Sequence, residues 1–397
     1  MQVPRFEPFA ALRYTPTLPL DLVAAPPYDV LSDADVDSLL ARHPRNIVAI
    51  DVPREVDGPQ RYDDAAARLQ AWVAEGSLVR DDAPSYTLYR MRFTDEAGTT
   101  RDTVGVLGAL EVVDEGAGGV LPHERTTPKA KSDRLDLTRA TNTNLSPVWG
   151  LSLTPGLTEL LRAPAEPVGS CTDENGVLHT VERVTDAARV AAIRDAVSAN
   201  PVLIADGHHR YAISRTFRDE QRAAGKGGAA AELTLTYVAE LVEDQLSIDA
   251  IHRLYHGVSV GQLVEILADS FDITDAGAVQ PAFASEVVAR GALCLVRPDG
   301  TGAWLTPKPS AFEGVRALDG AYLEHALREH DIDATYQHGV QHVADTLAAG
   351  GAAAGVLIRP TSIVEIRRTA DERLLMPPKS TFFTPKLRTG PVLRPLG

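Results

Sequence analysis

Residues 202–213 read VLIADGHHRYAI, and this stretch decides how the rest of the chain is interpreted. The apolar run VLIA is typical of a buried strand and leads directly into Asp206-Gly207. A helix is predicted to begin at once, because Ile213 and Phe217 are four residues apart and share one helical face. Gly207 permits a tight turn or a close approach of the backbone to a ligand. The pattern therefore predicts a strand–turn–helix unit with a ligand site at the turn.

The first turn of that helix would carry His208, His209 and Arg210. The start of a helix has unpaired N–H groups and the positive end of the helix dipole. Cationic side chains are unfavourable there unless an anion compensates their charge. Free N–H groups, a glycine and an arginine fork in one place favour a phosphate site.

Two other interpretations of this turn stay open. A zinc site needs three or four ligands, whereas adjacent histidines project in different directions and no H-x-x-x-H pair or cysteine cluster accompanies them. A plain solvated helix start, capped by Asp206, needs no ligand at all. Phosphate binding is the interpretation that accounts for all of the residues.

Composition limits the possible partners. The chain has 397 residues, 44% hydrophobic and 23% charged, which is typical of a soluble globular protein with two or three domains. Its net charge of −15 disfavours nucleic acid and membrane surfaces as partners, so an anion site has to be built locally from basic residues. No apolar run approaches the roughly 18 residues of a membrane span, the start lacks the pattern of a signal peptide, and only two cysteines occur. We expect a cytoplasmic protein.

Several local patterns predict elements in the first half. The S-x-x-D signal from Ser32 predicts a helix over about 33–42, and the apolar run 46–52 predicts a buried strand. Two strand patterns joined around DEAG predict a hairpin. Residues 121–148 are polar and interrupted by prolines, and we expect a long functional loop there.

The second half has a different pattern. From about residue 258 short helical patterns alternate with strand patterns, which predicts a second α+β unit. We therefore expect a nucleotide- or phosphate-binding catalytic unit over 1–257 and a second unit over 258–397.

A second basic segment, HERTTPKAKSDR, spans residues 123–134. Phosphoryl transfer needs cations on the phosphates, a carboxylate-held magnesium ion and a base for the attacking hydroxyl. The candidates are His123 or Glu124 as base, Lys129 and Arg134 as cations, and Asp133 or Asp206 as magnesium ligands. A solvated charged loop is the alternative interpretation of this segment.

Two further segments contain basic residues. Lys379, Ser380 and Thr381, followed by Lys386, offer a third set of phosphate donors, with ordinary salt bridging as the alternative. His252-Arg253 is interpreted as a strand end with exposed polar groups. The chain has no Walker-type loop, no G-x-G-x-x-G after a strand, no G-x-S-x-G and no H-E-x-x-H, so a nucleotide would be bound by none of these common loops.

The segments APPYDVLS, HERTTPKAKSDR, DGHHRYA, IHR and MPPKSTFFTPKL together resemble the bacterial domain-of-unknown-function family 1015 over nearly the whole chain. DGHHRYA is also similar to the G-x-x-R signature of the ParB/sulfiredoxin superfamily, in which this turn binds nucleotide phosphates. The resemblance implies phosphate contacts at Gly207, His208, His209 and Arg210. It also implies an α+β fold: a ParB/sulfiredoxin-like mixed α/β core with a second, smaller α+β unit.

That superfamily includes free-serine kinases, which phosphorylate the hydroxyl of the amino acid with ADP or ATP, and CTP-dependent DNA-binding switches. We expect a magnesium-dependent kinase that uses ATP or ADP and acts on a small-molecule hydroxyl such as that of free L-serine. A nucleotide-binding switch, or a slow nucleotide hydrolase without an acceptor, is the alternative. The net charge of −15 and the lack of a basic face argue against a DNA-binding version.

Overall fold

The computed structural model describes residues 3–95, 98–124 and 131–397, and the chain divides into two compact units. The first contains Met1–Leu246 together with Pro385–Gly397, and the second contains Ser247–Thr384. The sequence predicted units of 1–257 and 258–397. In the structure the end of the chain belongs to the first unit instead, because the strand Arg394–Pro395 pairs with Thr143–Asn144.

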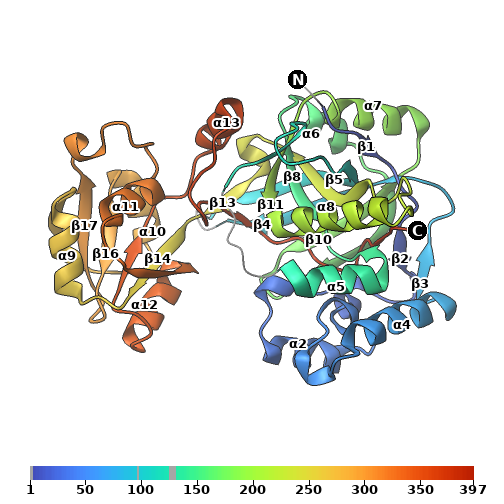
Figure 1. The fold of residues 1–397 in the computed structure, drawn as a ribbon, viewed down its shortest axis with the longest axis horizontal. Helices are drawn as coiled ribbons and strands as arrows, with labels where there is room; N and C mark the ends of the chain where they lie inside the picture. The colour runs from blue at the N-terminus through green and yellow to red at the C-terminus, as the bar shows by residue number, and fades with distance from the viewer. Residues whose placement is uncertain (1–2, 96–97, 125–130) are drawn as a thin grey trace. The chain divides into compact units, whose positions relative to one another are not determined.

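The first unit is built on a nine-stranded mixed sheet (Figure 1). Its strands are β1 (Phe6–Glu7), β4 (Tyr86–Thr94), β5 (Thr100–Glu111), β6 (Val120–Pro122), β8 (Val148–Ser152), β9 (Glu166–Thr172), β10 (Leu178–Val184), β11 (Val202–Asp206) and β12 (Leu233–Glu240). The order is β6-β11-β8-β12-β5-β4-β10-β9, with β1 paired to β5. β6 runs parallel to β11, and β8 runs parallel to β12.

Helices cover this sheet, and two small ribbons complete the unit. The helices are α1 (Leu20–Val23), α2 (Asp33–Arg42), α3 (Val48–Asp51), α4 (Arg61–Ala74), α5 (Lys131–Thr141), α6 (Leu157–Arg162), α7 (Ala187–Val197) and α8 (His208–Ala223), with 3-10 turns η1 (Tyr28–Val30), η2 (Glu55–Asp57) and η3 (Glu243–Gln245). The ribbons are β2 (Leu12–Tyr14) with β3 (Leu78–Arg80), and β7 (Thr143–Asn144) with β21 (Arg394–Pro395).

Two packing clusters hold the helices in place. Leu161 of α6 and Ile193 of α7 belong to the main core with the strands of the sheet. Leu135 of α5 packs with Ile213 and Phe217 of α8, so α5 and α8 lie side by side (Figure 1). This second cluster brings the charged start of α5 into the same region as the turn before α8.

The second unit is a six-stranded antiparallel sheet with helices on both faces. Its elements are β13 (Ser247–Asp249), β14 (Ile251–His256), α9 (Val260–Ala268), β15 (Phe271–Ala278), α10 (Phe283–Arg290), β16 (Leu293–Val296), β17 (Thr301–Pro307), η4 (Pro309–Phe312), α11 (Asp319–Leu327), β18 (Asp333–His338), α12 (Val340–Ala348), β19 (Ala354–Leu357), α13 (Ile363–Glu372) and β20 (Phe382–Thr384). Leu293 and Leu295 of β16 pack with α9 and α11, whereas Cys294 and Val296 pack with α10 and α12. Successive side chains of a strand point to opposite faces of the sheet, which explains why neighbouring residues of β16 contact helices on different sides. The chain is thus mixed α/β with a second, smaller α+β unit, as predicted.

Two local predictions are confirmed. Ser32 accepts a hydrogen bond from the Asp35 backbone N–H and the Asp35 side chain accepts from the Ser32 backbone, which is the capping box that starts α2. β4 and β5 form the predicted antiparallel hairpin.

Two others are wrong. The run 46–52 contains the short helix α3 (Val48–Asp51) instead of a strand, and Asn46 accepts a hydrogen bond from the Val48 N–H and donates to carbonyls in the preceding segment. Burial alone could not distinguish a helix from a strand in so short a run. Much of segment 121–148 is regular structure, because Leu135 and Leu137 give α5 a buried face despite its polar composition.

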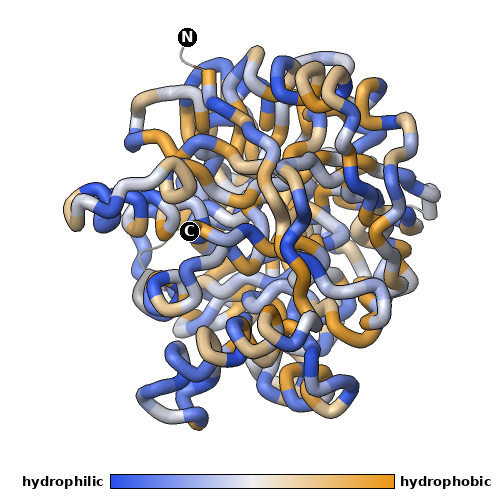
Figure 2. The backbone as a smooth tube through the Cα atoms, turned by 90° about the vertical axis from the view of Figure 1, so that its right-hand side faces the viewer, coloured by the Kyte–Doolittle hydropathy of each residue, from blue (hydrophilic) through white to orange (hydrophobic). Residues whose placement is uncertain are grey.

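Figure 2 shows the hydrophobic residues in short runs separated by hydrophilic ones, as expected from short strands and amphipathic helices. Within the part of the chain that the structure describes, no helix has the length and apolar character needed to cross a bilayer.

Gly105 of β5 supplies a test of the packing between β5 and β12. A Cβ at this position would lie 2.3 Å from ring carbons of Tyr237, which is fully buried between Tyr89 and Trp149. We expect Gly105→Ala to lower the free energy of unfolding by about 1–3 kcal/mol, because the enclosed ring has no room to move. Chemical denaturation measures this change. Gly228→Ala is the control, since its nearest atom would be 3.9 Å away, and an equal loss there would contradict the packing argument.

Candidate phosphate-binding site

The candidate site lies where the two parallel strands β6 and β11 end. Pro122 pairs with Ile204, so the next residue, His123, lies beside the end of β11. The Nδ1 of His123 donates to the Ile204 carbonyl oxygen at 2.5 Å. The pairing of β11 with β8 shifts register between Ile204 and Asp206. Such irregularities redirect side chains next to functional sites, and here the shift precedes the carboxylate of Asp206.

Gly207 makes the turn from β11 into α8. Its φ of +84° lies in the left-handed region, and an added Cβ would lie 3.0 Å from Arg210 Nε and 3.3 Å from Val148 Cα. The first helical hydrogen bond of α8 runs from the Tyr211 N–H to the Gly207 carbonyl. The N–H groups of residues 208–210 precede that bond, and the helix has no side-chain cap.

The carboxylate of Asp206 pairs with two cations. Arg210 Nη2 is 2.8 Å and Lys386 Nζ is 3.7 Å from Asp206 Oδ2, while Arg210 Nη1 donates to the Pro147 carbonyl. Burial by itself raises the pKa of Asp206, but the charges of Lys386, Arg210 and His208 outweigh it and lower that pKa. Two permanent cations, Arg210 and Lys386, therefore lie beside this carboxylate at the start of α8. Cations at a helix start are suited to binding an anion.

Two buried histidines complete this cluster. The rings of His123 and His208 are 5.0 Å apart between centroids. Burial lowers the pKa of His123 to about 4, although the Ile204 carbonyl opposes the shift. Burial, and next the neighbouring His123, hold the pKa of His208 well below its ordinary value. Both rings are thus neutral at pH 7. The Nε2 of His208 is buried without a hydrogen-bond partner among the residues that the structure describes, so this nitrogen is open to a ligand.

A second ion pair lies next to the first cluster. Arg134 Nη1 is 3.1 Å from Asp51 Oδ1 and also donates to the Asp51 carbonyl, and its guanidinium stands 3.7 Å from the centre of the Tyr28 ring. Burial raises the pKa of Asp51, with Arg134 and then Arg210 opposing it. Asp51, Arg134 and Arg210 line one small pocket of about 40 Å³ together with Ser214. The structure thus brings Arg134 and Arg210 together, as a shared phosphate site requires.

The remaining candidates of the 123–134 segment fall in different places. Glu124 Oε2 is 3.9 Å from His123 Nε2, and its side chain is 15% exposed. Asp133 accepts from the Tyr62 hydroxyl at 2.6 Å and lies 3.4 Å from Arg134 Nε. Lys129 lies outside the described residues.

Magnesium has no preformed cage here. Across residues 3–95, 98–124 and 131–397, no three His, Cys, Asp or Glu side chains are grouped so that they could hold a metal ion. The two predicted ligands already contact cations: Asp206 contacts Arg210 and Lys386, and Asp133 contacts Arg134. They fit magnesium only as single carboxylates that add to the oxygens of a bound phosphate.

Lys379, Ser380 and Thr381 of the third predicted set belong to the second unit, whereas Lys386 belongs to the first. Ser380 and Thr381 are buried, Ser380 Oγ donates to the Pro377 carbonyl at 2.8 Å, and Lys379 is exposed with a φ of +57°. The phosphate-binding role of these three residues stays a prediction. The expectation of exposed polar groups at His252-Arg253 is wrong, because both side chains are buried in β14.

Two residues at the site, Tyr28 and Asp51, were not predicted as site residues. Tyr28 lies in the quoted APPYDVLS segment, and Asp51 lies within the apolar run 46–52 that was interpreted as a strand. A charged residue inside an apolar run was the available signal for Asp51. Lys386 was predicted as a phosphate donor, but nothing local placed it beside Asp206.

The family model described as "Protein of unknown function (DUF1015)" matches residues 6–321. The chain belongs to the DUF1015 family. No curated protein matches this sequence. The similarity to the ParB/sulfiredoxin signature stays a prediction.

Some solved structures are similar to this DUF1015 chain at low identity. One is "Free serine kinase in complex with AMP", 16% identical, with 69% of this chain and 86% of that chain covered and a TM-score of 0.38. A conserved hypothetical protein from Pyrococcus furiosus is 14% identical, with 68% and 91% covered and a TM-score of 0.37. "SbnI with C-terminal truncation" from Staphylococcus aureus is 15% identical, with 73% and 87% covered and a TM-score of 0.39.

The buried His123 predicts a pH dependence of stability. Its folded pKa of about 4 lies below the ordinary value of 6.5, so protonation favours the unfolded chain. The stabilisation is complete above about pH 6.5 and is lost as the pH falls towards 4, with a slope of up to about 1.4 kcal/mol per pH unit. Denaturation across this range should show a shallower slope for His123→Gln than for the wild type.

The control for this measurement is the exposed His330, whose replacement by Gln should leave the slope as it is. Equal slopes for wild type and His123→Gln would contradict a neutral, buried His123.

Proposed function

We propose that the first unit binds the phosphates of a nucleotide at the β11–α8 turn and transfers a phosphoryl group to the hydroxyl of a small molecule. The observation that carries the proposal is the gathering of Arg210 and Lys386 around Asp206, beside the first turn of α8, which has no side-chain cap. Cations at a helix start are groups that bind phosphate oxygens. Free L-serine is the first acceptor to test, and ATP and ADP are the donors.

In this proposal each group of the cluster has a separate task. The N–H groups of residues 208–210 and the unpartnered Nε2 of His208 bind phosphate oxygens. Arg210 and Lys386 neutralise the charge that develops on the transferred group, which supplies most of the catalysis in phosphoryl transfer. Asp206 holds both cations in position. Arg134 of α5, which pairs with Asp51, is a further cation next to the phosphates. The predicted contributions of Gly207 and His209 belong to the same turn.

Glu124 is the proposed base for the acceptor hydroxyl. His123, the other candidate, is fully enclosed and its pKa is lowered to about 4, which makes it a weak base at neutral pH. Glu124 keeps partial exposure and stands 3.9 Å from His123. His123 then acts as a positioning residue that packs beneath the turn through its bond to Ile204.

Magnesium would arrive with the nucleotide, held by phosphate oxygens and by one carboxylate, with Asp206 and Asp133 as the candidates. When bound, it would neutralise part of the phosphate charge.

Arg210→Ala tests the proposal directly. Phosphorus NMR of the protein with magnesium, L-serine, and ATP or ADP in turn should show phosphoserine in the wild type. In the variant we expect the rate to fall at least about a hundredfold, because the charge on the transferred phosphoryl group loses its fork-shaped partner. Arg210→Lys should recover only part of the rate, since lysine keeps the charge but not the fork.

Arg215→Ala, on the same helix and paired with the exposed Glu115, is the matched control and should retain wild-type turnover. Circular dichroism checks that each variant is folded. Equal activity in a folded Arg210→Ala protein would overturn the site. A nucleotide that binds but stays intact with serine and with a panel of other hydroxyl compounds would instead indicate a nucleotide-binding switch.

Lys386→Met tests the contribution of the C-terminal segment. Loss of this cation should weaken nucleotide binding, measured by isothermal titration calorimetry, by about tenfold or more, because one charged partner of the phosphates is removed. Lys308→Met removes a half-exposed lysine of the second unit and should leave the affinity as in the wild type. Unchanged binding in Lys386→Met would remove this residue from the site.

A further inference from the structure

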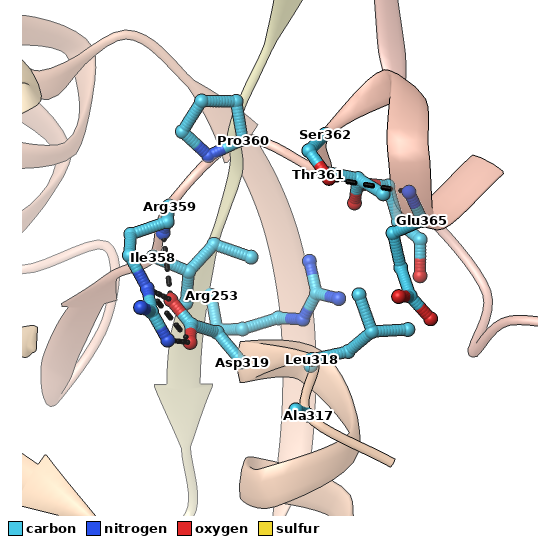
Figure 3. A pocket seen from close by; sticks show the side chains of 12 residues that line it. Arg253, Ala317, Leu318, Asp319, Ile358, Arg359, Pro360, Thr361, Ser362 and Glu365 are labelled. Carbon is cyan, nitrogen blue, oxygen red and sulfur yellow. Dashed lines mark hydrogen bonds and ion pairs between the residues drawn. The ribbon is translucent and has the colours of Figure 1, made fainter. Parts of the chain in front are cut away.

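A pocket of about 210 Å³ lies within the second unit, and Figure 3 shows the guanidinium of Arg253 there, between the Asp319–Arg359 pair and Glu365. Two arginines and two carboxylates line this pocket, so their charges match and the pocket calls for no added ion. The first unit has a buried group of a different kind, a chain of hydrogen bonds that reaches the segment of Lys386.

This chain links three side chains of neighbouring strands to the C-terminal segment. Asp173 Oδ2 lies 3.1 Å from His179 Nε2, and His179 Nδ1 lies 3.0 Å from the Tyr89 hydroxyl. The same hydroxyl accepts the backbone N–H of Arg388 at 3.0 Å. Tyr89 and His179 are fully buried. The chain therefore joins the turn between β9 and β10 to the segment that returns to the first unit.

The direction of each hydrogen bond follows from the groups involved. The Asn175 and Val177 N–H groups donate to Asp173 Oδ1 at 2.9 Å. Burial raises the pKa of Asp173, but hydrogen bonds from His179 and then from the Val177 backbone outweigh it and lower that pKa. The ionised carboxylate only accepts, so His179 Nε2 carries a proton. With that tautomer, Nδ1 accepts from the Tyr89 hydroxyl, and every donor of the chain has an acceptor.

The bond to Tyr89 is the enclosed contact of Arg388. Arg388 Nη1 is also 3.3 Å from Glu174 Oε1, but the Glu174 side chain is 53% exposed, and such ion pairs contribute little in water. A buried N–H group that loses its acceptor is costly by comparison. Thr389 bonds to Ala25, one residue farther from Lys386. Tyr89 thus holds the backbone two residues from Lys386.

Lys386 depends on this hold for its place in the ion cluster. Its Nζ is 3.7 Å from Asp206 Oδ2, and two residues span at most about 7 Å of backbone, so a shift at Arg388 moves the lysine. We infer that Tyr89 is a positioning residue of the phosphate site, which sets Lys386 beside Asp206 through Arg388, while His179 and Asp173 orient its hydroxyl. The benefit to nucleotide binding rests on the proposed function, whereas the placement of Lys386 does not.

Lysine acetylation tests this placement on the full chain without a nucleotide. The Lys386 side chain is 18% exposed beside Asp206, and the exposed Lys226 is the internal reference. We expect Tyr89→Phe to speed the labelling of Lys386 by acetic anhydride severalfold relative to Lys226, because the segment is released. Mass spectrometry of the labelled peptides measures the two rates.

Tyr86→Phe is the matched control for this measurement. Tyr86 lies on the same strand, is equally buried, and loses a hydrogen bond to the Phe6 carbonyl instead. Its replacement should leave the labelling of Lys386 as in the wild type.

Because loss of the buried hydroxyl could unfold the unit, Asp173→Asn provides a second variant that keeps Tyr89. The amide oxygen can retain the turn bonds, but the amide NH2 donates to His179 and reverses the tautomer. His179 Nδ1 then donates to the Tyr89 oxygen and competes with the Arg388 N–H. Lys386 should again be labelled faster than in the wild type.

A double-mutant cycle separates positioning from a general loss of stability. Tyr89→Phe should weaken nucleotide binding, measured by isothermal titration calorimetry, by about threefold or more. The same change in the Lys386→Met protein should cause no further loss, because the residue that Tyr89 positions is already absent.

Two results would overturn the inference: labelling of Lys386 at the wild-type rate in folded Tyr89→Phe or Asp173→Asn, or an equal loss of affinity from Tyr89→Phe with and without Lys386. A wild type that binds no nucleotide would overturn the proposed function instead, and the labelling rates would still decide whether Tyr89 places Lys386.

Discussion

The carboxylate of Asp206 joins three parts of the first unit that are far apart in the chain. It ends β11, it pairs with Arg210 one turn into α8, and it pairs with Lys386 from the segment that returns from the second unit. The arrangement places two cations beside one carboxylate at a helix start, in a chain whose net charge is −15. Gly207 is part of the same constraint, because its φ is left-handed and a Cβ there would crowd Arg210 and the Val148 backbone.

Burial determines the chemistry around this ion cluster. The enclosed histidines His123 and His208 are neutral at pH 7, so they offer hydrogen bonds rather than charge. The permanent cations are Arg210, Lys386 and Arg134. A neutral nitrogen beside fixed cations suits an anion with several oxygens, because the cations attract the charge while the imidazole and the N–H groups orient the oxygens.

The second unit has a buried arginine of its own. Arg253 donates to the carbonyls of Lys379 and Pro378, and it lines a pocket together with the first residues of α11. Ser380, of the segment that continues towards Lys386, lines the same pocket. One segment, MPPKSTFFTPKL, therefore contributes Ser380 to the pocket of the second unit and Lys386 to the cluster of the first.

The sequence by itself determined the local features. The DGHHR turn, the capping box at Ser32 and the hairpin between β4 and β5 depend on residues only a few positions apart, so hydrogen bonding and allowed backbone angles specify them directly. An apolar run such as 46–52 defines burial but not the type of element. Only the tertiary structure placed Lys386 beside Asp206, Arg134 above Tyr28, and Ser380 in a pocket with Arg253. These contacts join residues that are distant in sequence, and their geometry depends on how the helices and the returning C-terminal segment pack on the sheets.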